Sequence, residues 1–227
     1  MKKLHKVEFH CHTLISKDSL VRPEDLIERC RRKRIDRVVI TDHNSTAAAE
    51  YARQIDPVRV IVGEEIMTQQ GEILAAFVAE EIPAGLPALE VIDRLRQQGA
   101  FISVSHPFDQ MRNGHWQIED LLQIAPLVDA IETFNARCML PGYNAQAAIF
   151  AREQGLPGTA GSDAHALIEL GTAYLLLEPI ENADDLQEKI IHAEFRTRHS
   201  PGWVHLFSRY AAWRKKTSPP GTYELGT

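Results

Sequence analysis

The stretch Val7-Glu8-Phe9-His10-Cys11-His12 begins as a short apolar run and ends in two histidines. Such a run, bounded by polar residues, predicts a β-strand. Segments with helical spacing and further β-branched runs, such as residues 37–41 and 101–105, then alternate almost to the end of the chain. This alternation is typical of βαβ units with parallel pairing. We therefore expect about seven parallel strands, arranged in a short or distorted (β/α) barrel in preference to an open sheet.

The remaining elements follow from the same periodicities. Strands are predicted at residues 7–12, 37–41, 58–62, 73–78, 101–105, 128–134, 156–161 and 172–177. Helices are predicted at residues 23–34, 45–54, 87–98, 118–124, 143–154, 183–193 and 203–216. No GxGxxG motif follows the first strand, so a dinucleotide fold has no support. We expect a single domain over residues 1–216 and a loose tail over residues 217–227, which contains Pro219-Pro220-Gly221.

The composition excludes several classes of protein. The chain has 227 residues, of which 44% are hydrophobic and 25% charged, as in an ordinary globular domain. Its net charge of −6 argues against a broad electrostatic grip on nucleic acid, so we expect no extended duplex binding. Three cysteines without a CxxC pair argue against a disulfide framework. No apolar run reaches the ~18 residues of a membrane span or forms a signal core, so we expect a cytoplasmic protein.

Histidine is the residue type that points to chemistry. Of ten histidines, five fall where predicted strands end, and each has a carboxylate or another histidine nearby: His10, His12, His43, His106 and His165. In a parallel α/β fold the carboxyl ends of the strands form one face, where sites are built. Side chains two positions apart on a strand point to the same side, so each of the pairs His10–His12 and Asp163–His165 can hold one metal.

The donor set predicts more than one metal ion. The candidate ligands are His10, His12, Asp18, His43, Glu65, His106, Asp163 and His165. Imidazole and carboxylate without thiolate suit Zn, Mn or Fe, and eight donors exceed the three or four that a single zinc needs. We expect two or three divalent ions, with Glu65 as a bridge. Three ions and three carboxylates would leave a charge of about +3, which favours a phosphate substrate.

Four ordered motifs resemble the PHP family, the polymerase and histidinol phosphatase domain. They are His10-Cys11-His12-Thr13 with Ser16-Lys17-Asp18-Ser19, Thr41-Asp42-His43-Asn44, Ser105-His106-Pro107 and Gly161-Ser162-Asp163-Ala164-His165. The stretch Gly63-Glu64-Glu65-Ile66 is similar to the one that carries the family's bridging glutamate. The resemblance covers residues 5–178. The short chain and residues 129–137 are similar to the stand-alone metal-dependent phosphoesterases of the family.

This resemblance implies a distorted (β/α)7 barrel with a trinuclear site at the carboxyl ends of the strands. One metal would take His10, His12, Glu65 and Asp163, and another would take Asp18, His43 and His165. A further metal would take Glu65 and His106, with Asn135 or Cys138 as the open choice for its last ligand. Asp18 lies one residue later than in the commonest form of the motif.

The expected activity is hydrolysis of a phosphate ester, with a metal-bridging hydroxide as the nucleophile. Arg137 and, with weaker support, Arg112 are the expected phosphate-binding residues, because guanidinium binds phosphate in a bidentate manner. His43 or His165 could protonate the leaving group, so His43, Asp163 and His165 form the expected catalytic set. The substrate would be a small phosphorylated metabolite, a nucleotide or an oligonucleotide end. The alternatives are an amidohydrolase-like metal hydrolase and a metal-stabilised regulatory module without turnover.

Other polar residues have simpler interpretations. Asp42 is expected to orient a neighbour or cap a turn, and Glu64 to lie beside the ligands or in solvent. Cys11 points away from its flanking histidines and should belong to the core. The basic run 209–216 is expected to be a solvated helix face, with a nucleic-acid contact as the alternative. Five histidines without partners in the sequence are expected in solvent: His5, His115, His192, His199 and His205.

Overall fold

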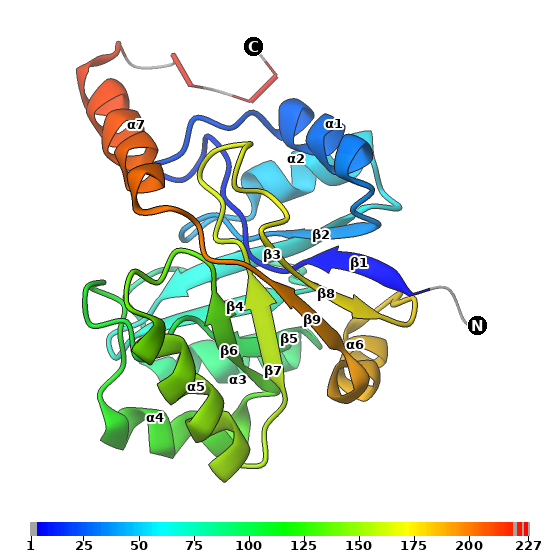
Figure 1. Ribbon diagram of the computed structural model, residues 1–227, viewed down its shortest axis with the longest axis vertical. Coiled ribbons are helices and arrows are strands. Elements are labelled where there is room, and N and C mark those ends of the chain that lie inside the picture. Colours follow the sequence, from blue (N-terminus) through cyan, green and yellow to red (C-terminus); the bar gives the residue numbers. More distant parts are fainter. Residues whose placement is uncertain (1–3, 220–221, 224, 227) are drawn as a thin grey trace.

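A computed structural model describes residues 4–219, 222–223 and 225–226 (Figure 1). These residues form a nine-stranded sheet in the order β7-β6-β5-β4-β3-β2-β1-β8-β9. The strands are β1 His5–Glu8, β2 Arg37–Ile40, β3 Val60–Met67, β4 Glu72–Ala76, β5 Phe101–Val104, β6 Ala130–Asn135, β7 Gly158–Gly161, β8 Ala173–Leu177 and β9 Glu194–Thr197. Strand β9 was not predicted from the sequence.

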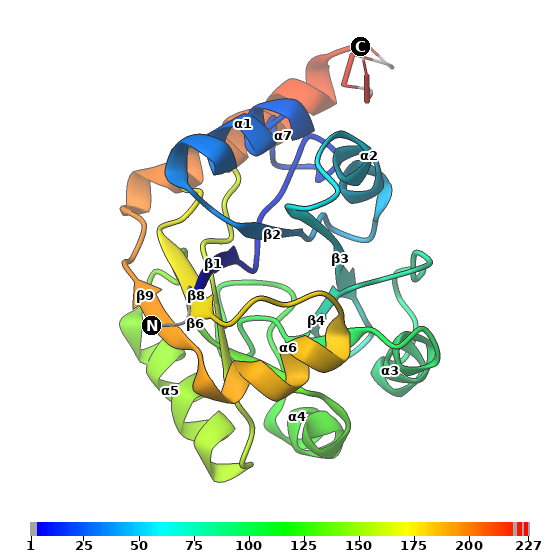
Figure 2. The same ribbon diagram turned by 90° about the vertical axis from the view of Figure 1, so that its right-hand side faces the viewer.

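Helices surround the outside of this sheet (Figure 2). They are α1 Pro23–Lys33, α2 Ala47–Ile55, α3 Ala88–Gln97, α4 Ile118–Ile124, α5 Pro141–Glu153, α6 Ala183–Lys189 and α7 His205–Thr217, with 3-10 turns η1 Ala125–Leu127, η2 Ile190–His192 and η3 Gly202–Val204. Helices α1, α2 and α3 are amphipathic: α3, for example, buries Val91, Ile92 and Leu95, which share one face at helical spacing. Such a face gives these helices an apolar stripe to pack against the sheet.

Seven of the described strands, β1, β2, β3, β5, β6, β7 and β9, run in the same direction, whereas β4 and β8 run opposite to them. The expectation of parallel pairing is wrong at two of the predicted strands, because β4 runs antiparallel to both β3 and β5, and β8 runs antiparallel to β1. Only residues 68–71 separate β3 from β4, and Thr68 closes that turn by bonding to Gly71. A turn this short can join only antiparallel strands, since a parallel crossover needs about a dozen residues or more.

The sheet curls into a nearly closed barrel, as predicted. Strands β1 and β7 meet at their carboxyl ends. Beyond β1 and β7 the backbone of Cys11 bridges that of Ala164. The Asp163 amide donates to the His10 carbonyl at 2.8 Å, and the His12 amide donates to the Ala164 carbonyl at 2.9 Å. A Cβ on Gly161 would lie 2.3 Å from the Cβ of His10, so only glycine allows this approach. The closure therefore places the first and last histidine motifs side by side.

The ends of the elements shift two expectations. Strand β1 ends at Glu8, so His10 and His12 lie in the loop beyond it, whereas β3 extends to Met67 and contains Glu65.

No helix among the described residues is long and apolar enough to cross a membrane. Within the predicted tail, Thr217 is the last residue of α7, and residues 220–221, 224 and 227 lie outside the described residues.

Candidate metal centre

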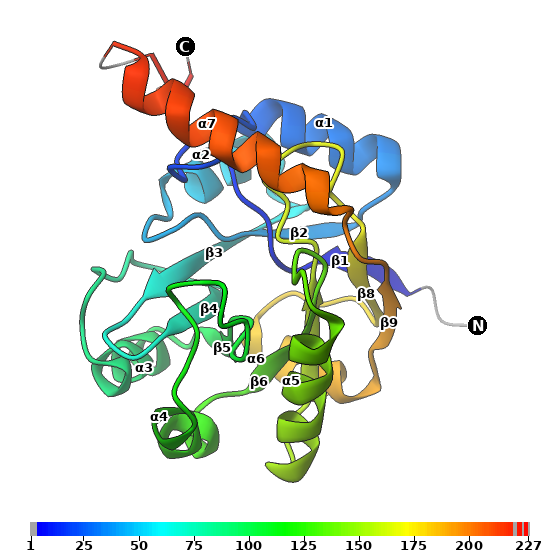
Figure 3. The ribbon, with the colours of Figure 1, turned by 60° about the vertical axis from the view of Figure 1, so that its left-hand side comes forward.

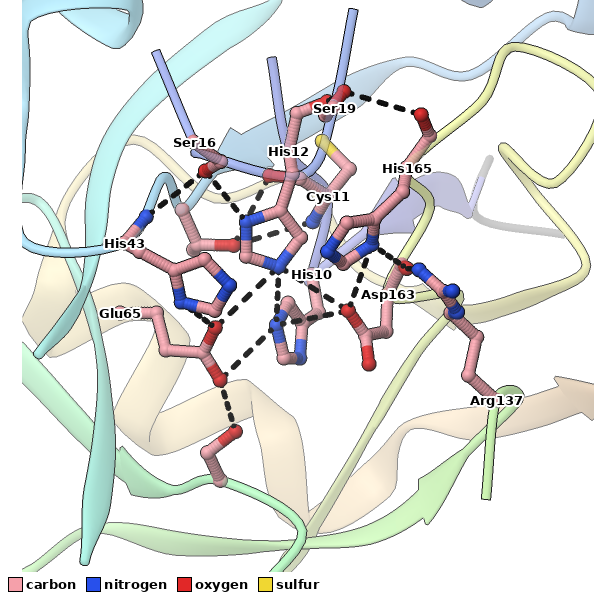
Figure 4. Close-up of polar contacts among 12 residues, drawn as sticks. His10, Cys11, His12, Ser16, Ser19, His43, Glu65, Arg137, Asp163 and His165 are labelled. Atoms are coloured by element: carbon pink, nitrogen blue, oxygen red, sulfur yellow. Dashed lines mark hydrogen bonds and ion pairs between the residues drawn. The ribbon is translucent and has the colours of Figure 1, made fainter. Parts of the chain in front are cut away.

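All eight predicted donors lie together at the carboxyl ends of the barrel strands. Figure 4 shows His10, His12, His43, Glu65, Asp163 and His165 of this cluster. They come from the loops after β1, β2, β5 and β7, and from within β3. Six of the eight are buried completely or nearly so, while Asp18 and His43 reach the surface of the cluster with side chains 24% and 18% exposed. The sequence motifs are thus far apart along the chain and adjacent in space.

Glu65 is the centre of the cluster. Its Oε1 lies 3.1 Å from His106 Nε2 and 3.4 Å from His10 Nε2. Its Oε2 lies 2.9 Å from His43 Nδ1 and 3.4 Å from His12 Nε2. Each carboxylate oxygen therefore faces two imidazoles, which is the geometry of a carboxylate that could bridge metals.

Two further carboxylates complete the cluster. Asp163 Oδ1 lies 3.2 Å from His12 Nε2 and 3.4 Å from His165 Nδ1. Asp18 lies between the outer histidines, 3.3 Å from His165 Nε2 and 3.7 Å from His43 Nε2. The structure thus brings together the groups of residues that the family resemblance implies for the individual metals.

The unpaired atoms of this cluster fit divalent cations. Among the described residues, three groups offer ligand atoms within 4.8 Å of one another: His10, His12 and Asp163; His12, His43 and His165; and His43, Glu65 and Glu72. Glu65 Oε2, Asp163 Oδ1 and Asp18 Oδ1 are buried without a hydrogen-bond partner. A buried carboxylate oxygen is costly unless it is paired or coordinates a metal. Orphaned oxygens that face imidazoles are thus the donor arrangement expected of a metal site.

The pKa shifts of His12, His165 and Glu65 agree with metal binding, whereas Glu65 and its neighbouring carboxylates, against the effect of burial, raise the pKa of His10 and raise that of His43 to about 9. Burial, aided by the neighbouring His165 and His43, lowers the pKa of His12 to about 3. Burial and the Arg137 guanidinium lower the pKa of His165. Burial opposes ionisation of Glu65, but His10 and His43 outweigh it and hold the Glu65 pKa well below its ordinary value. Neutral imidazoles and ionised carboxylates are the forms that bind metal.

A hydrogen-bonded chain behind the donors fixes their orientation. Asp42 accepts from the Thr13 amide at 2.7 Å and from the Ser16 hydroxyl at 2.5 Å. The Ser16 hydroxyl is also 3.0 Å from His12 Nδ1 and accepts from the His43 amide at 3.0 Å. Asp42 therefore orients the two histidine loops, as expected, and is in none of the donor groups found among the described residues.

Sequence reasoning missed two buried glutamates. Glu132 lies within β6, where its Oε1 is 2.9 Å from His10 Nδ1 and its Oε2 accepts from the His106 amide at 2.9 Å. Glu72, the first residue of β4, lies 3.5 Å from His106 Nε2 and 3.9 Å from His43 Nδ1. Neither has a histidine neighbour in the sequence. The inward-facing position of Glu132 in a predicted strand was the only available signal.

The structure supports neither Asn135 nor Cys138 as the last ligand of the metal ion expected at Glu65 and His106. The Asn135 amide nitrogen donates to Asp163 and Glu132, each at 3.1 Å, and its oxygen accepts from the Arg137 amide at 2.9 Å. Burial raises the pKa of the Cys138 thiol, so a thiolate is disfavoured. Cys138 is in none of the groups of His, Cys, Asp and Glu donors found among the described residues, whereas Glu72 is in one.

A pocket of about 350 Å³ opens above the cluster. It is lined by Asp18, His43, Asp109, Met111, Arg112, Arg137, Met139, His165, His205, Ser208 and Arg209. Arg112 pairs with Asp163 Oδ2 at 2.5 Å, and Arg137 pairs with Glu169 at 3.5 Å and donates to the Ser208 hydroxyl at 2.6 Å. The two arginines predicted to bind phosphate thus both border the donor cluster.

Several expectations about solvated residues are wrong. His205 is half-buried, 3.3 Å from Arg137, because α7 folds back over the pocket. Lys215 Nζ donates to the Leu14 and Ser16 carbonyls, so the basic run is not wholly a solvated face. Glu64 is fully buried and bonds the Ile82 amide, and burial raises its pKa to about 8. His5 and His115 are half-buried, whereas His192 and His199 are exposed as expected.

The fold and the donor set define a barrel-type, metal-dependent hydrolase. The family model described as the PHP domain matches residues 8–134, and the model described as PHP-associated matches residues 141–194. The chain belongs to the PHP family, as its motifs predicted.

Relatives and solved structures agree with this assignment. An uncharacterized protein of Methanocaldococcus jannaschii, MJ0417, is 37% identical over 190 residues, which are 81% of this chain and 76% of that protein. PsfC from Pseudomonas syringae has a similar fold, with a TM-score of 0.67 and 16% identity over 95% of this chain and all of the other. A candidate metal-dependent phosphoesterase of Bifidobacterium adolescentis has a TM-score of 0.60 and 19% identity, over 85% of this chain and 97% of the other.

Proposed function

We propose that this protein is a phosphoesterase that hydrolyses a phosphate ester of a small metabolite, a nucleotide or an oligonucleotide end. The observation that carries the proposal is the pocket, in which Arg112, Arg137 and Arg209 stand above the buried donor cluster. Guanidinium groups bind phosphate by paired hydrogen bonds, and no neutral amide substrate needs them. This arrangement favours phosphate esters over the amidohydrolase alternative.

The metal ligands in this proposal are the eight donors predicted from the sequence, with Glu65 bridging and Glu72 as an added candidate beside His43 and His106. Two or three ions of Mn, Fe or Zn suit such imidazole and carboxylate groups. When bound, these ions would activate water and neutralise the oxygens of the phosphate. The complete donor set also argues against a regulatory module without turnover.

The protein side chains have separate roles in this mechanism. Arg137 holds the phosphate, and Ser208 and Glu169 fix its guanidinium at the pocket wall. Arg112 lies across the pocket and keeps Asp163 ionised, because its charge holds the Asp163 pKa well below the ordinary value against the effect of burial. His43 and His165 line the pocket, and either one, when it does not bind a metal ion, could donate a proton to the leaving alkoxide.

The direct test is a substrate screen with the metal-reconstituted protein. It uses p-nitrophenyl phosphate, bis-p-nitrophenyl phosphate, short oligonucleotides and a p-nitroanilide amide, each with Mn²⁺. We expect release from at least one phosphate ester and none from the amide. Release from the amide alone would establish the amidohydrolase alternative, and no release from any substrate would contradict the proposal.

The cellular setting is also part of the proposal. The three cysteines, Cys11, Cys30 and Cys138, are all buried and unpaired. Free thiols persist in reducing compartments, which supports a cytoplasmic location.

A further inference from the structure

Helix α7 lies on the outside of the molecule (Figure 3). This helix and the 3-10 turn η3 before it carry large apolar side chains that are exposed to solvent. Among the described residues of this segment, these side chains are 41–61% exposed: Trp203, Leu206, Phe207, Tyr210 and Trp213. We call this set the aromatic face. Single exposed apolar residues are ordinary, but a contiguous apolar patch marks an interaction site.

The aromatic face is not needed to attach α7 to the barrel. Tyr210 follows Leu206 by four residues and Phe207 by three, and Trp213 follows Tyr210 by three, so these side chains share one side of α7, with Trp203 in the preceding turn η3. Two ring pairs form along it: Trp203 meets Phe207 edge-on at 5.7 Å between ring centres, and Tyr210 lies tilted against Trp213 at 5.9 Å. The other side of the segment makes the contacts with the protein, through buried Val204 and Ala211 and through Ser208, which bonds Arg137.

Positive charge accompanies the aromatic face. Residues 205–217 contain no acidic residue, although the whole chain has a net charge of −6. Arg209, Arg214 and Lys216 are exposed. Arg209 also lines the pocket above the metal centre, and Trp213 follows it by one helical turn. A continuous path therefore leads from the pocket over Arg209 to the aromatic face.

The family match does not account for this helix. The two family models end at residues 134 and 194, and α7 begins at His205. Its aromatic face therefore lies outside the regions that the two family models match. A segment of this kind is a reasonable place to find the feature that selects a particular substrate.

We propose that the aromatic face of α7 is a docking surface for single-stranded nucleic acid, whose phosphate end enters the pocket. This inference rests on the proposed phosphoesterase function and specifies its substrate class. Single strands bind where aromatic side chains stack on bases and cationic side chains track the backbone, without sequence preference. Four of the five residues of the face are aromatic, and Arg209 is common to the face and the pocket.

Charge complementarity favours this occupant over a second copy of the chain. A two-fold contact places the same patch on both subunits, so α7 against α7 would oppose Arg214 and Lys216 of one copy to those of the other. A lipid surface would accept the cations, but it would not use the continuity between the aromatic face and the pocket. An anionic, base-bearing strand satisfies all three features.

The test is fluorescence anisotropy with a labelled 12-nucleotide single strand and a duplex of the same length, in EDTA so that no turnover occurs. We expect saturable binding of the single strand, weaker binding of the duplex and a loss of affinity with salt. Y210A/W213A should weaken single-strand binding about tenfold or more, because each stacked base contributes ~1–3 kcal/mol. Trp213→Phe should retain most of the affinity, since it keeps the ring.

The matched control is Leu122→Ala, which removes a side chain 47% exposed on α4 and should leave the affinity unchanged. Equal single-strand affinity of the wild type and folded Y210A/W213A overturns the inference. Absence of single-strand binding by the wild type overturns the inference as well. In that case, loss of binding to phosphatidylglycerol vesicles in Y210A/W213A would indicate a lipid surface as the occupant, and dissociation of a dimer would indicate a second copy of the chain. A protein that binds the strand in EDTA and hydrolyses no phosphate ester contradicts the proposed function alone.

Discussion

The metal centre and α7 differ in which kind of side chain they bury and which they expose. The centre buries charge, with Glu65, Asp163 and His10 fully inaccessible, whereas α7 exposes Tyr210 and Trp213 to solvent. Folding alone favours the opposite distribution, because buried charge is costly and exposed aromatic area gains nothing. Each region departs from that distribution in a way that a ligand would compensate: cations at the centre, and an aromatic, anionic strand at α7. The comparison yields five predictions, taken here from the largest effect to the smallest.

Removing the metals should produce the largest effect. A chelator-treated protein should lose all phosphate ester hydrolysis and melt about 5–10 °C lower, because the buried carboxylates lose their counter-charge and a ligand at 100 times its Kd stabilises by ~2.7 kcal/mol. Activity and differential scanning calorimetry before and after Mn²⁺ addition measure this. An unchanged melting temperature and rate would show that the buried charge needs no metal.

Substituting single donors should come next. Asp163→Asn keeps the shape, and asparagine tolerates the backbone φ of 51° at this position. It should lower kcat about 1,000-fold or more, and His12→Ala should act similarly, with folded proteins by circular dichroism. Near-wild-type rates in either variant would refute the ligand assignment of that residue.

Arg137→Lys should have a smaller effect on catalysis. The ammonium keeps the charge but loses the forked contacts to Ser208 and Glu169, so kcat/KM should fall about 10- to 100-fold. Arg152→Lys, at an exposed position in α5, is the control. Steady-state kinetics on the best phosphate ester tests this, and equal values for the two variants would remove Arg137 from phosphate binding.

Glu72→Gln should mainly weaken metal binding. Removing its charge beside His43 and His106 should lower the affinity of one ion about 10- to 100-fold, the range found when the residues that support metal ligands are changed. Metal titration followed by calorimetry measures the loss, and activity should recover at high Mn²⁺. A titration identical to that of the wild type would exclude Glu72 from the centre.

Trp213→Ala should have the smallest effect on the fold. Its side chain is 57% exposed, so the free energy of unfolding should change by about 0.5 kcal/mol or less, in contrast to substitutions in the centre. Chemical denaturation tests this. A loss of several kcal/mol would mean that the aromatic face supports the fold, which would weaken the case for a ligand there.

The sequence was most informative where chemistry follows strand ends. His43, His106 and His165 could be assigned to one face from their positions alone, and the structure brings them together. Glu72 and Glu132 could not be assigned, because a carboxylate within or beside a strand looks solvent-exposed until the barrel closes around it. The reversed direction of β4 and the burial of His205 depend on a tight turn and on the return of α7, and neither has a local sequence signal.

Barrel closure also has a consequence for the order of assembly. The Ser162 hydroxyl, just after β7, donates to the His10 carbonyl, just after β1, although 152 positions separate the two residues in the sequence. The centre therefore joins two strands that lie far apart along the chain. A chain still being synthesised cannot form the centre until the whole barrel has emerged. Closing so long a loop carries a substantial entropic cost before its contacts form. A metal ion bound there would stabilise the closed barrel and would not stabilise partly folded chains, in which the ligands are still apart.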